Sequence, residues 1–480
     1  MFMSIATAEW SSETLRILSL AAYVLVASGV TAHALLRKQD VRAALGWIAL
    51  AWLSPILGGA LYYIFGINRV TRRAVRIAAR DRAESTVQPA SELPQVTENI
   101  VTLADVGQRV TGMVLTAGNA VSLLRGGEEA YPAMLEAICN ARHSIALASY
   151  IFRDDAIGRR FIDALIDAQK RGVAVRVLID GVGSGYFFSP TLRHLRAGGV
   201  PVARFLHTWV PWRMPFLNMR NHKKLLIADG GLAFTGGLNI GAENSANADP
   251  KIGVDDIHLR IEGPVVAQLM DSFAQDWSFT TDEMLDRRLW WPSPAMTGTV
   301  FARGVESGPD ADLYKIETIL GAALAQARRR VRIVTPYFLP DQRLVFAIAQ
   351  AALRGVDIDI VLPERTDYAP LDWAMRAHLR FLSTMPVNVH LSPLPFDHAK
   401  LMTVDGEWCL AGSSNWDTRS LRLNFEFDVE CYDRALVGKI DSLIERKIAR
   451  SVRLQRRDLM AAPKWKQLRD AAVRLLLPYL

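Results

Sequence analysis

An internal duplication limits the fold of this 480-residue chain more than any other feature. A β-branched run, a helical pattern and a second β-branched run follow one another in residues 141–180, and the same order recurs in residues 327–362. Gly172 and Gly355 stand where each helix should end, in the position that favours a left-handed residue. Each copy therefore predicts a strand–helix–strand unit in a parallel or mixed sheet covered by helices. A repeat of about 180 residues is too long for a solenoid, so we expect two similar α/β domains.

A polar motif of the form H-x-K-x4-D follows each copy at a similar distance. Its members are His222, Lys224 and Asp229 in the first copy and His398, Lys400 and Asp405 in the second. If the motif lies in a β-strand, alternation places its His and Lys on one face. A single occurrence carries little weight, because chance or a structural histidine explains most of them. Two occurrences in register within a repeat indicate one functional site.

Further polar residues recur at matched positions. Asn239 and Asn415 lie at the same offset from the two histidines. Gly237 stands where the second copy has Ser413, so the first half-site lacks one hydroxyl group. The duplication is thus not perfectly symmetric in its polar groups.

These residue types suit a phosphodiester substrate. Lysine and asparagine side chains can hold the non-bridging oxygens, while one histidine attacks phosphorus and the other protonates the departing alkoxide. Each histidine then needs a carboxylate that fixes its tautomer, a role open to Asp256 (or, less favoured, Asp255) and to Glu426. The chain shows no carboxylate cluster with metal-site spacing, so we predict a covalent mechanism without metal or other cofactor.

Two uncharged runs near the N-terminus predict membrane helices. They cover residues 17–36 and 43–68, and each reaches the roughly 20 apolar residues that cross a bilayer. A cleaved signal peptide fits the first run less well, because Glu9 and Glu13 precede it and a second run follows at once. We expect a transmembrane hairpin over residues 1–68, with spans at about 17–36 and 43–65.

The positive charge of the chain is concentrated in two segments. The net charge is +7, yet residues 69–82 hold six arginines and residues 446–474 hold ten basic side chains. A nuclease groove would need basic residues along the catalytic domains, so this distribution favours an anionic membrane over nucleic acid. The arginines after the second span predict a cytoplasmic catalytic region, although the basic residues between the spans oppose that orientation. Three scattered cysteines fit a reducing compartment.

These features predict a domain order. After the hairpin we expect a basic juxtamembrane segment and linker at residues 69–105. A first catalytic half then occupies residues 106–295, and a second half with the basic C-terminal segment occupies residues 296–480.

The chain resembles the phospholipase D superfamily, whose signature is the duplicated H-x-K-x4-D motif. Within it the chain is similar to membrane-anchored bacterial cardiolipin synthases, and the resemblance covers nearly the whole sequence. The matching segments include Tyr150-Ile-Phe152, Arg220-Asn-His222, Thr335-Pro-Tyr-Phe338, Asn415-Trp-Asp417-Thr-Arg419-Ser420 and Asn424-Phe-Glu426.

The resemblance implies two packed halves with one shared site in a protein of the bacterial inner membrane. It implies phosphatidyl transfer between two phosphatidylglycerol molecules, giving cardiolipin and glycerol through a phosphatidyl-histidine. It also implies that His222 attacks and that His398 acts as acid and then base, although the sequence itself does not separate these roles. The oligomeric state stays open.

Two alternatives and several secondary features also follow from the sequence. A hydrolytic phospholipase D or another phosphodiesterase would use the same intermediate, and a non-enzymatic membrane scaffold is disfavoured by the intact motifs. The aromatic stretch 205–216 and the basic C-terminal segment are candidates for lipid contact, against ordinary packing or a solvated helix face. Asp397 beside His398 suggests a raised histidine pKa, and His258 is a minor candidate for the site.

Overall fold

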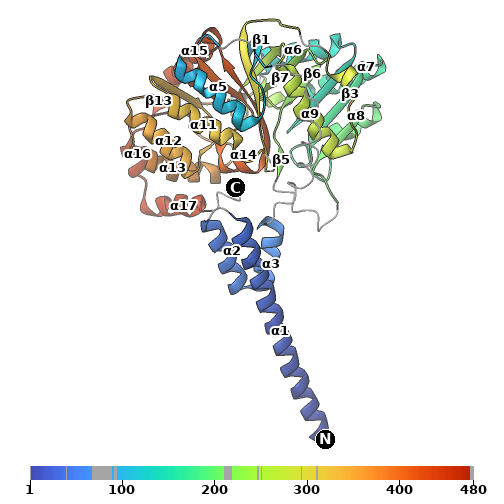
Figure 1. Ribbon diagram of the computed structural model, residues 1–480, viewed down its shortest axis with the longest axis vertical. Helices are drawn as coiled ribbons and strands as arrows, with labels where there is room; N and C mark the ends of the chain where they lie inside the picture. Colours follow the sequence, from blue (N-terminus) through green and yellow to red (C-terminus); the bar gives the residue numbers. More distant parts are fainter. Residues whose placement is uncertain are drawn as a thin grey trace. The chain divides into compact units, whose positions relative to one another are not determined.

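The computed structural model describes residues 2–38, 41–66, 89–90, 94–209, 219–245, 248–249, 251–292, 295–309 and 312–475. The chain divides into two compact units, residues 1–70 with 208–218 and residues 71–207 with 219–480, which we call the membrane unit and the catalytic unit (Figure 1). The arginine-rich segment 69–82, most of the aromatic stretch 205–216 and residues 476–480 lie outside the described residues.

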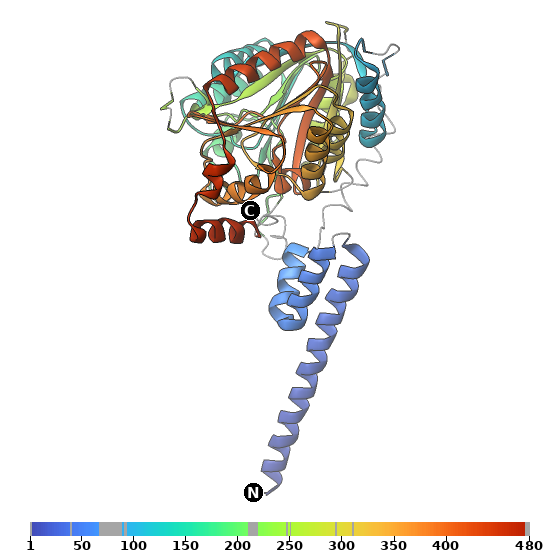
Figure 2. The same cartoon turned by 90° about the vertical axis from the view of Figure 1, so that its left-hand side faces the viewer.

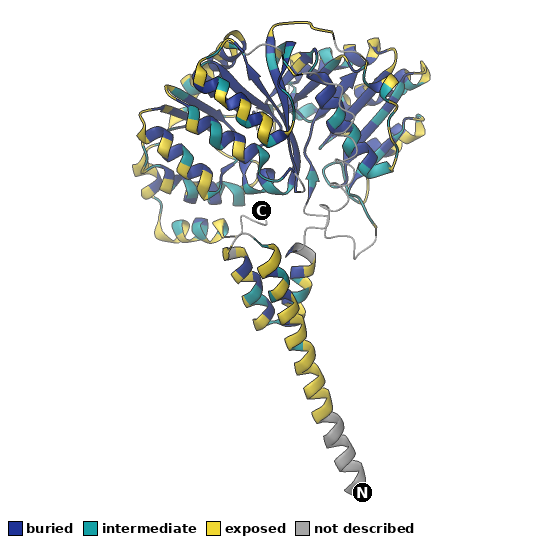
Figure 3. Cartoon of the chain, viewed as in Figure 1, coloured by how far each residue is buried: buried dark blue, intermediate teal, exposed yellow. Residues whose placement is uncertain are grey.

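The first helix of the membrane unit has the length and composition of a membrane span. Helix α1 runs over Phe2–Arg37. Its segment Glu13–Arg37 is long enough and apolar enough to cross a bilayer. Large apolar side chains such as Leu18 and Leu25 are exposed along it, and Figure 3 shows this helix mostly in the exposed colour. An apolar helix with an exposed apolar surface fits a lipid environment.

The second apolar run does not form the single continuous span that the sequence predicts. It divides into α2 (Val41–Leu53), α3 (Pro55–Leu61) and a π-helical turn, Tyr62–Gly66. Ser54 leaves the helical conformation immediately before Pro55, and the chain turns back so that the backbone of Gly58 lies against Leu50. Proline disfavours a helical residue before it, which explains the break. At 1.5 Å per residue α2 is about 20 Å long, shorter than a bilayer core of ~30 Å.

The catalytic unit is built on one 16-stranded mixed sheet to which the two halves contribute equivalent strands. The first half contributes, in spatial order, β1 (Thr116–Arg125), β9 (Ile257–Glu262), β7 (Leu232–Gly236), β6 (Leu225–Ala228), β2 (Ser144–Ser149), β3 (Ala174–Asp180) and β4 (Val202–Phe205). The second half contributes β10 (Val300–Ser307), β19 (Asn424–Tyr432), β17 (Trp408–Gly412), β16 (Leu401–Val404), β11 (Arg330–Val334), β13 (Asp357–Pro363), β14 (Asn388–Ser392) and β20 (Val452–Arg453). The short strand β5 (Arg220–Asn221) of the first half joins the sheet off this path by pairing with β19.

The two halves join at the antiparallel pair β1–β10, and the strand order is repeated outward from it. The predicted strand–helix–strand units are the parallel pairs β2–β3 and β11–β13, while the strands nearer the centre are antiparallel. The expectation of two similar α/β halves on a mixed sheet is confirmed. The duplication of the sequence is therefore also a duplication of topology.

Helices cover the sheet of each half. Those of the first half are α6 (Gly126–Asn140), α7 (Ala156–Lys170), α8 (Pro190–Ala197), α9 (Val266–Thr281) and α10 (Arg287–Trp290). Those of the second half are α11 (Lys315–Gln326), α12 (Gln342–Leu353), α13 (Ala369–Leu382), α14 (Thr418–Arg422), α15 (Arg434–Arg450), α16 (Arg456–Met460) and α17 (Lys464–Arg474). Asp155 and Asp341 cap α7 and α12, and Gly172 and Gly355 follow these helices with φ of 88° and 90° as expected.

Helix α5 (Glu98–Thr111) lies in a segment that the sequence predicts to be largely a linker. Its buried residues Ile100, Leu103 and Ala104 belong to the apolar core of the second half. Figure 2 shows α5 beside the orange helices of that half. Helix α5 therefore precedes the first half in the sequence but packs on the second half.

Candidate active site

The two motifs meet at a cavity between the halves. The cavity has a volume of about 920 Å³ and is lined by residues of both halves, including His222, His398, Asn239 and Asn415. The pair β1–β10 joins the halves side by side in one sheet, and the cavity lies where residues of the two halves meet. The structure brings together the two motifs that the sequence separates.

Short strands at the domain boundary position the histidines. Strand β5 (Arg220–Asn221) pairs with β19 of the second half, and β15 (Phe396–Asp397) pairs with β8 (Val254–Asp255) of the first. The His222 N–H then donates to the Phe425 carbonyl at 2.8 Å, and the His398 N–H donates to the Asp255 carbonyl at 2.8 Å. The His and Lys of each motif lie just before β6 and β16, so the expectation that they occupy a strand is wrong. Their backbone is instead held by the opposite half.

Each histidine is oriented by a carboxylate of the opposite half. His222 Nδ1 lies 2.8 Å from Glu426 Oε2, and His398 Nδ1 lies 2.7 Å from Asp256 Oδ2. An ionised carboxylate only accepts, so Nδ1 donates and Nε2 keeps its lone pair. Asp255, the less favoured candidate, binds Lys447 at 2.9 Å instead. The crossed pairs make the site complete only when both halves are folded together.

The pKa values of the two carboxyl groups are shifted in opposite directions. Burial raises the pKa of the Glu426 carboxyl, and Lys224 and neighbouring hydrogen-bond donors offset this only in part. Burial also acts to raise the pKa of Asp256, but Lys400 and His398 outweigh it, so that pKa is lowered. Burial, followed by the nearby lysines, lowers the pKa of His398 and holds that of His222 well below its usual value.

Both motif lysines are buried next to the histidines. Burial lowers the pKa of Lys224 to about 7 and that of Lys400 to about 8, although the carboxylates Glu426 and Asp256 oppose the shift. Lys224 Nζ donates to the His222 carbonyl at 2.6 Å, and Lys400 Nζ donates to the His398 carbonyl. An anion in the cavity would favour the charged form of both lysines.

The two asparagines line the cavity, and Ser413 supports a carboxylate beside it. Asn239 Oδ1 accepts from the Ile151 N–H at 3.2 Å, which leaves its amide nitrogen for other partners. Asn415 is buried, and its Oδ1 has no hydrogen-bond partner among the described residues. Ser413 Oγ donates to Glu426 Oε2 at 2.6 Å, so its hydroxyl acts on the carboxylate.

The motif aspartates serve the fold. The Asp229 carboxylate accepts from the backbone N–H groups of residues 142–144, and Asp405 accepts from those of residues 328–330. Both residues have positive φ, at 49° and 55°, in the turns that follow β6 and β16. Each aspartate therefore fixes the start of the strand that opens its own repeat, β2 or β11.

Asp397 lies beside a histidine whose pKa is lowered, by burial and then by Lys400, and is not raised as the sequence suggests. Its carboxylate binds Lys447 Nζ at 2.7 Å, and Lys447 also binds Asp255. Lys447, on α15, therefore joins β15 to β8 beneath the His398–Asp256 pair. Because Lys447 is buried among these carboxylates, it is not part of a lipid-facing stripe.

The other residues that the sequence suggested for lipid contact or for the site have structural roles, as far as they lie among the described residues. Phe205 is buried and packs against Phe279 and Phe425, while the stretch after Trp209 lies outside the described residues. Burial lowers the pKa of His258 to about 4, and this residue does not line the cavity. Helix α17 packs on α13 through an ion pair between Arg380 and Asp470 at 2.6 Å.

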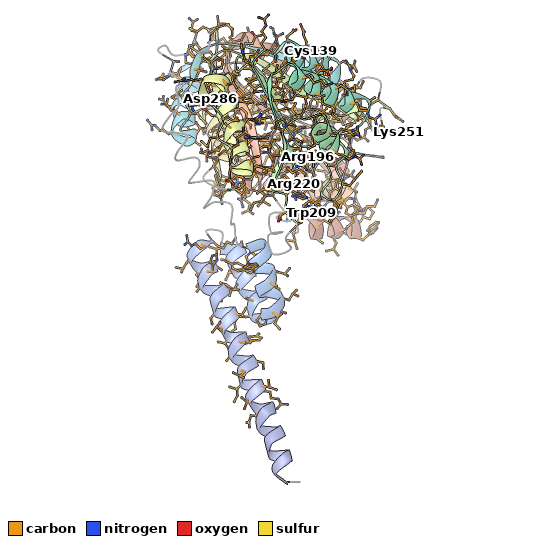
Figure 4. The ribbon with its side chains drawn as sticks, turned by 90° about the vertical axis from the view of Figure 1, so that its right-hand side faces the viewer. Cys139, Arg196, Trp209, Arg220, Lys251 and Asp286 are labelled. Carbon is orange, nitrogen blue, oxygen red and sulfur yellow. The ribbon has the colours of Figure 1, made fainter. Side chains whose placement is uncertain are left out.

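Three cavity residues were not recognised as functional from the sequence. Arg220, Arg419 and Asn424 line the cavity, and Figure 4 labels Arg220 together with Lys251, another lining residue. Their spacing from known site residues could have identified them. Arg220 lies two residues before His222, Arg419 lies four after Asn415, and Asn424 lies two before Glu426. Among the described residues, no group of three or more His, Cys, Asp or Glu side chains is placed to hold a metal ion.

Comparisons with known proteins agree on one family. A family model described as "Cardiolipin synthase, PLD-like domain" matches residues 134–277 and 320–448. The chain is 30% identical over 461 residues to the major cardiolipin synthase ClsA of Bacillus subtilis, covering 92% of this chain and 95% of that protein. It is 31% identical over 459 residues to cardiolipin synthase A of Pseudomonas aeruginosa, covering 93% of each.

A solved structure shares the fold of the catalytic unit. The phosphatidylserine synthase of Haemophilus influenzae superposes with a TM-score of 0.62 at 15% identity, over 79% of this chain and all of that one. At this identity the likeness shows the fold alone. The two-half architecture is thus that of an experimentally known protein.

Proposed function

The chain belongs to the cardiolipin synthase family of phospholipase D-like proteins, and from this premise we propose that it transfers a phosphatidyl group between two phosphatidylglycerol molecules. The products are cardiolipin and glycerol. The observation that carries the proposal is the crossed pairing of His222 with Glu426 and of His398 with Asp256 around one cavity.

In the first step, Nε2 of one motif histidine attacks the phosphorus of phosphatidylglycerol. The second motif histidine enters this step as the imidazolium and gives its Nε2 proton to the departing glycerol oxygen as the bond from phosphorus to that oxygen breaks. A phosphatidyl-histidine and free glycerol result. The carboxylate on each Nδ1 makes Nε2 the reacting atom of both rings, with a lone pair on the attacking histidine and a proton on the second.

In the second step, a hydroxyl of another phosphatidylglycerol gives its proton to the second histidine. Its oxygen then attacks phosphorus, and the phosphorus–nitrogen bond breaks to release cardiolipin. Lys224, Lys400 and the two asparagines hold the non-bridging oxygens, where negative charge grows in each transition state. Their burial strengthens this interaction because water does not screen it.

The test is a separation of lipid products. Purified full-length protein in mixed micelles with labelled phosphatidylglycerol should yield labelled cardiolipin and an equal amount of glycerol. Phosphatidic acid without cardiolipin would instead indicate a hydrolytic phospholipase D. The absence of any lipid product would contradict both functions.

We further propose that this is a membrane protein whose catalytic unit lies in the cytoplasm. The six arginines of residues 69–82 support this side for the chain that follows them. Cys139 is exposed on α6 (Figure 4), whereas Cys409 and Cys431 are buried. A membrane-impermeant thiol reagent should therefore label inside-out vesicles and leave intact spheroplasts unlabelled, with Cys139→Ser as the control. The reverse labelling would place the unit outside.

A further inference from the structure

The pseudo-symmetry of the cavity gives each of its lining positions a counterpart. The pair β5–β19 places Arg220 opposite Asn424, and the equivalent pair β15–β8 places Phe396 opposite Val254. All four residues line the cavity. At matched positions, a cation and an amide therefore face a phenyl ring and an aliphatic side chain.

A third matched position differs in the same direction. Arg419 lies four residues after Asn415, and Glu243 lies four residues after Asn239. The Glu243 carboxylate is bound by Arg153 at 2.8 Å, so its charge is neutralised. The three positions Arg220, Arg419 and Asn424, which we call the cationic end, thus carry two cations and an amide, whereas their counterparts are two apolar side chains and a carboxylate paired with Arg153.

The two guanidinium groups of the cationic end are close enough to oppose each other electrostatically. Burial, and then the charge of Arg220, lower the pKa of Arg419. Both groups also act on Tyr150, whose ring lies 4.9 Å from that of His222. The cationic end therefore adjoins the reacting centre.

Two buried carboxylates that act on Arg419, Asp180 and Asp417, are also bound by backbone N–H groups. Asp180 accepts from the backbone N–H groups of Val182, Gly183 and Asn221, each at 2.8 Å. Asp417 accepts from the Ser420 N–H at 2.8 Å, and burial raises its pKa to about 6. The mutual repulsion of the two guanidinium groups nevertheless favours an added anion beside them.

Asn424 adds an independent sign of a ligand. Its side chain is only 6% exposed, and its Nδ2 donates to Glu426 at 3.1 Å. Its Oδ1 has no hydrogen-bond partner among the described residues. A buried acceptor beside two guanidinium groups suits a ligand that carries both an anion and a hydroxyl group.

We propose that the cationic end binds the head group of the acceptor phosphatidylglycerol: Arg220 and Arg419 hold its phosphodiester, and Asn424 accepts from a glycerol hydroxyl. This inference rests on the proposed function and names the residues that select the second substrate. The phosphate of the acceptor lies three carbons from its terminal hydroxyl. The anion is thus held away from the phosphorus that this hydroxyl attacks.

The test compares an anionic acceptor with a neutral one. Full-length protein receives labelled phosphatidylglycerol in mixed micelles with butan-1-ol, so that cardiolipin and phosphatidylbutanol form from the same intermediate. Arg419→Gln and Arg220→Gln should each lower the ratio of cardiolipin to phosphatidylbutanol about tenfold, the effect of losing one charged hydrogen bond. Phosphatidylbutanol formation should stay within about threefold of wild type, which also reports that the variant is folded.

The matched control is Arg365→Gln, which removes a cavity-lining cation outside the cationic end. Its product ratio should equal that of wild type. An unchanged ratio in both arginine variants, an equal loss of the two products, or the same change in Arg365→Gln would overturn the inference. Wild-type protein that forms neither product would instead contradict the proposed function.

Discussion

His222 and His398 occupy equivalent positions, yet the carboxylates that orient them are held by different kinds of group. Besides the nearby charge of Lys224, Glu426 has three neutral donors, Ser413 at 2.6 Å, Asn424 at 3.1 Å and Ser420. Asp256 accepts from a backbone N–H at 2.7 Å and takes its remaining stabilisation from Lys400 and His398. The comparison teaches that duplication has kept the geometry of the two pairs while changing how each is stabilised.

Steric contact explains part of this difference. A Cβ atom at Gly237 would lie 2.3 Å from Asp256 Oδ1, so the first half-site has no room for a counterpart of Ser413. Glutamate is one methylene longer than aspartate, and the longer side chain of Glu426 reaches His222 from farther away. Glycine at position 237 therefore goes together with aspartate at position 256, and serine at position 413 goes together with glutamate at position 426.

Replacing either histidine should have the largest effect. His222→Asn and His398→Asn should each reduce cardiolipin formation by at least about 10³-fold, because each removes a group that bonds to phosphorus or transfers a proton. The measurement is product formation from labelled phosphatidylglycerol. Thermal unfolding of the purified variants provides the control for folding.

The same variants can show which histidine attacks phosphorus and which one transfers the proton. With phosphatidylglycerol labelled in its phosphate, only a variant that keeps the attacking histidine can retain label on the protein after denaturation. Substantial activity in either variant would contradict a shared site. Retention of label by both variants would contradict a single attacking histidine.

The substitution Gly237→Ala should have the next largest effect. The added methyl group must displace the Asp256 carboxylate from His398, so we expect a loss of activity of about 10²-fold. Steady-state rates checked against thermal stability would measure it. Activity within twofold of wild type would mean that Asp256 does not need this position.

The buried lysines predict a decline of activity in alkali. With pKa values lowered to about 7 and about 8, Lys224 and Lys400 are charged at lower pH and lose their charge as the pH rises through these values. We expect kcat/KM to fall by more than about tenfold between roughly pH 7 and 9, with apparent pKa values that belong to the coupled pair. Lys224→Arg should move the decline to higher pH, and a flat profile for the wild type would contradict this reading.

Much of the catalytic fold was predictable from the sequence because it rests on local patterns. Periodicity and the glycines at the helix ends gave the strand–helix–strand units, and the repeated offsets gave the two motifs. The break at Ser54 was not predicted, because hydropathy alone does not distinguish one long helix from two short ones. The chain reverses at Pro55.

The contacts across the halves could not be predicted for a different reason. Asp256 and Glu426 were identified as partners for the histidines, but which carboxylate faces which histidine depends on the pairs β5–β19 and β15–β8. The same holds for Lys447, whose partners Asp255 and Asp397 are distant in sequence. The spacing of residues along the chain does not predict contacts between residues so far apart in sequence.

The smallest expected effect is that of Ser413→Ala, and it tests the comparison most finely. Glu426 would lose one neutral hydrogen bond worth about 0.5–1.5 kcal/mol, so the rate should fall only about twofold to tenfold. The alanine keeps the Cβ atom for which this half-site has room, which makes it the counterpart of Gly237→Ala. Measured under identical conditions, the two alanine variants should therefore differ by about tenfold or more. Equal losses would mean that the two carboxylates are held alike, and the asymmetry of donors around His222 and His398 would then have no consequence for the rate.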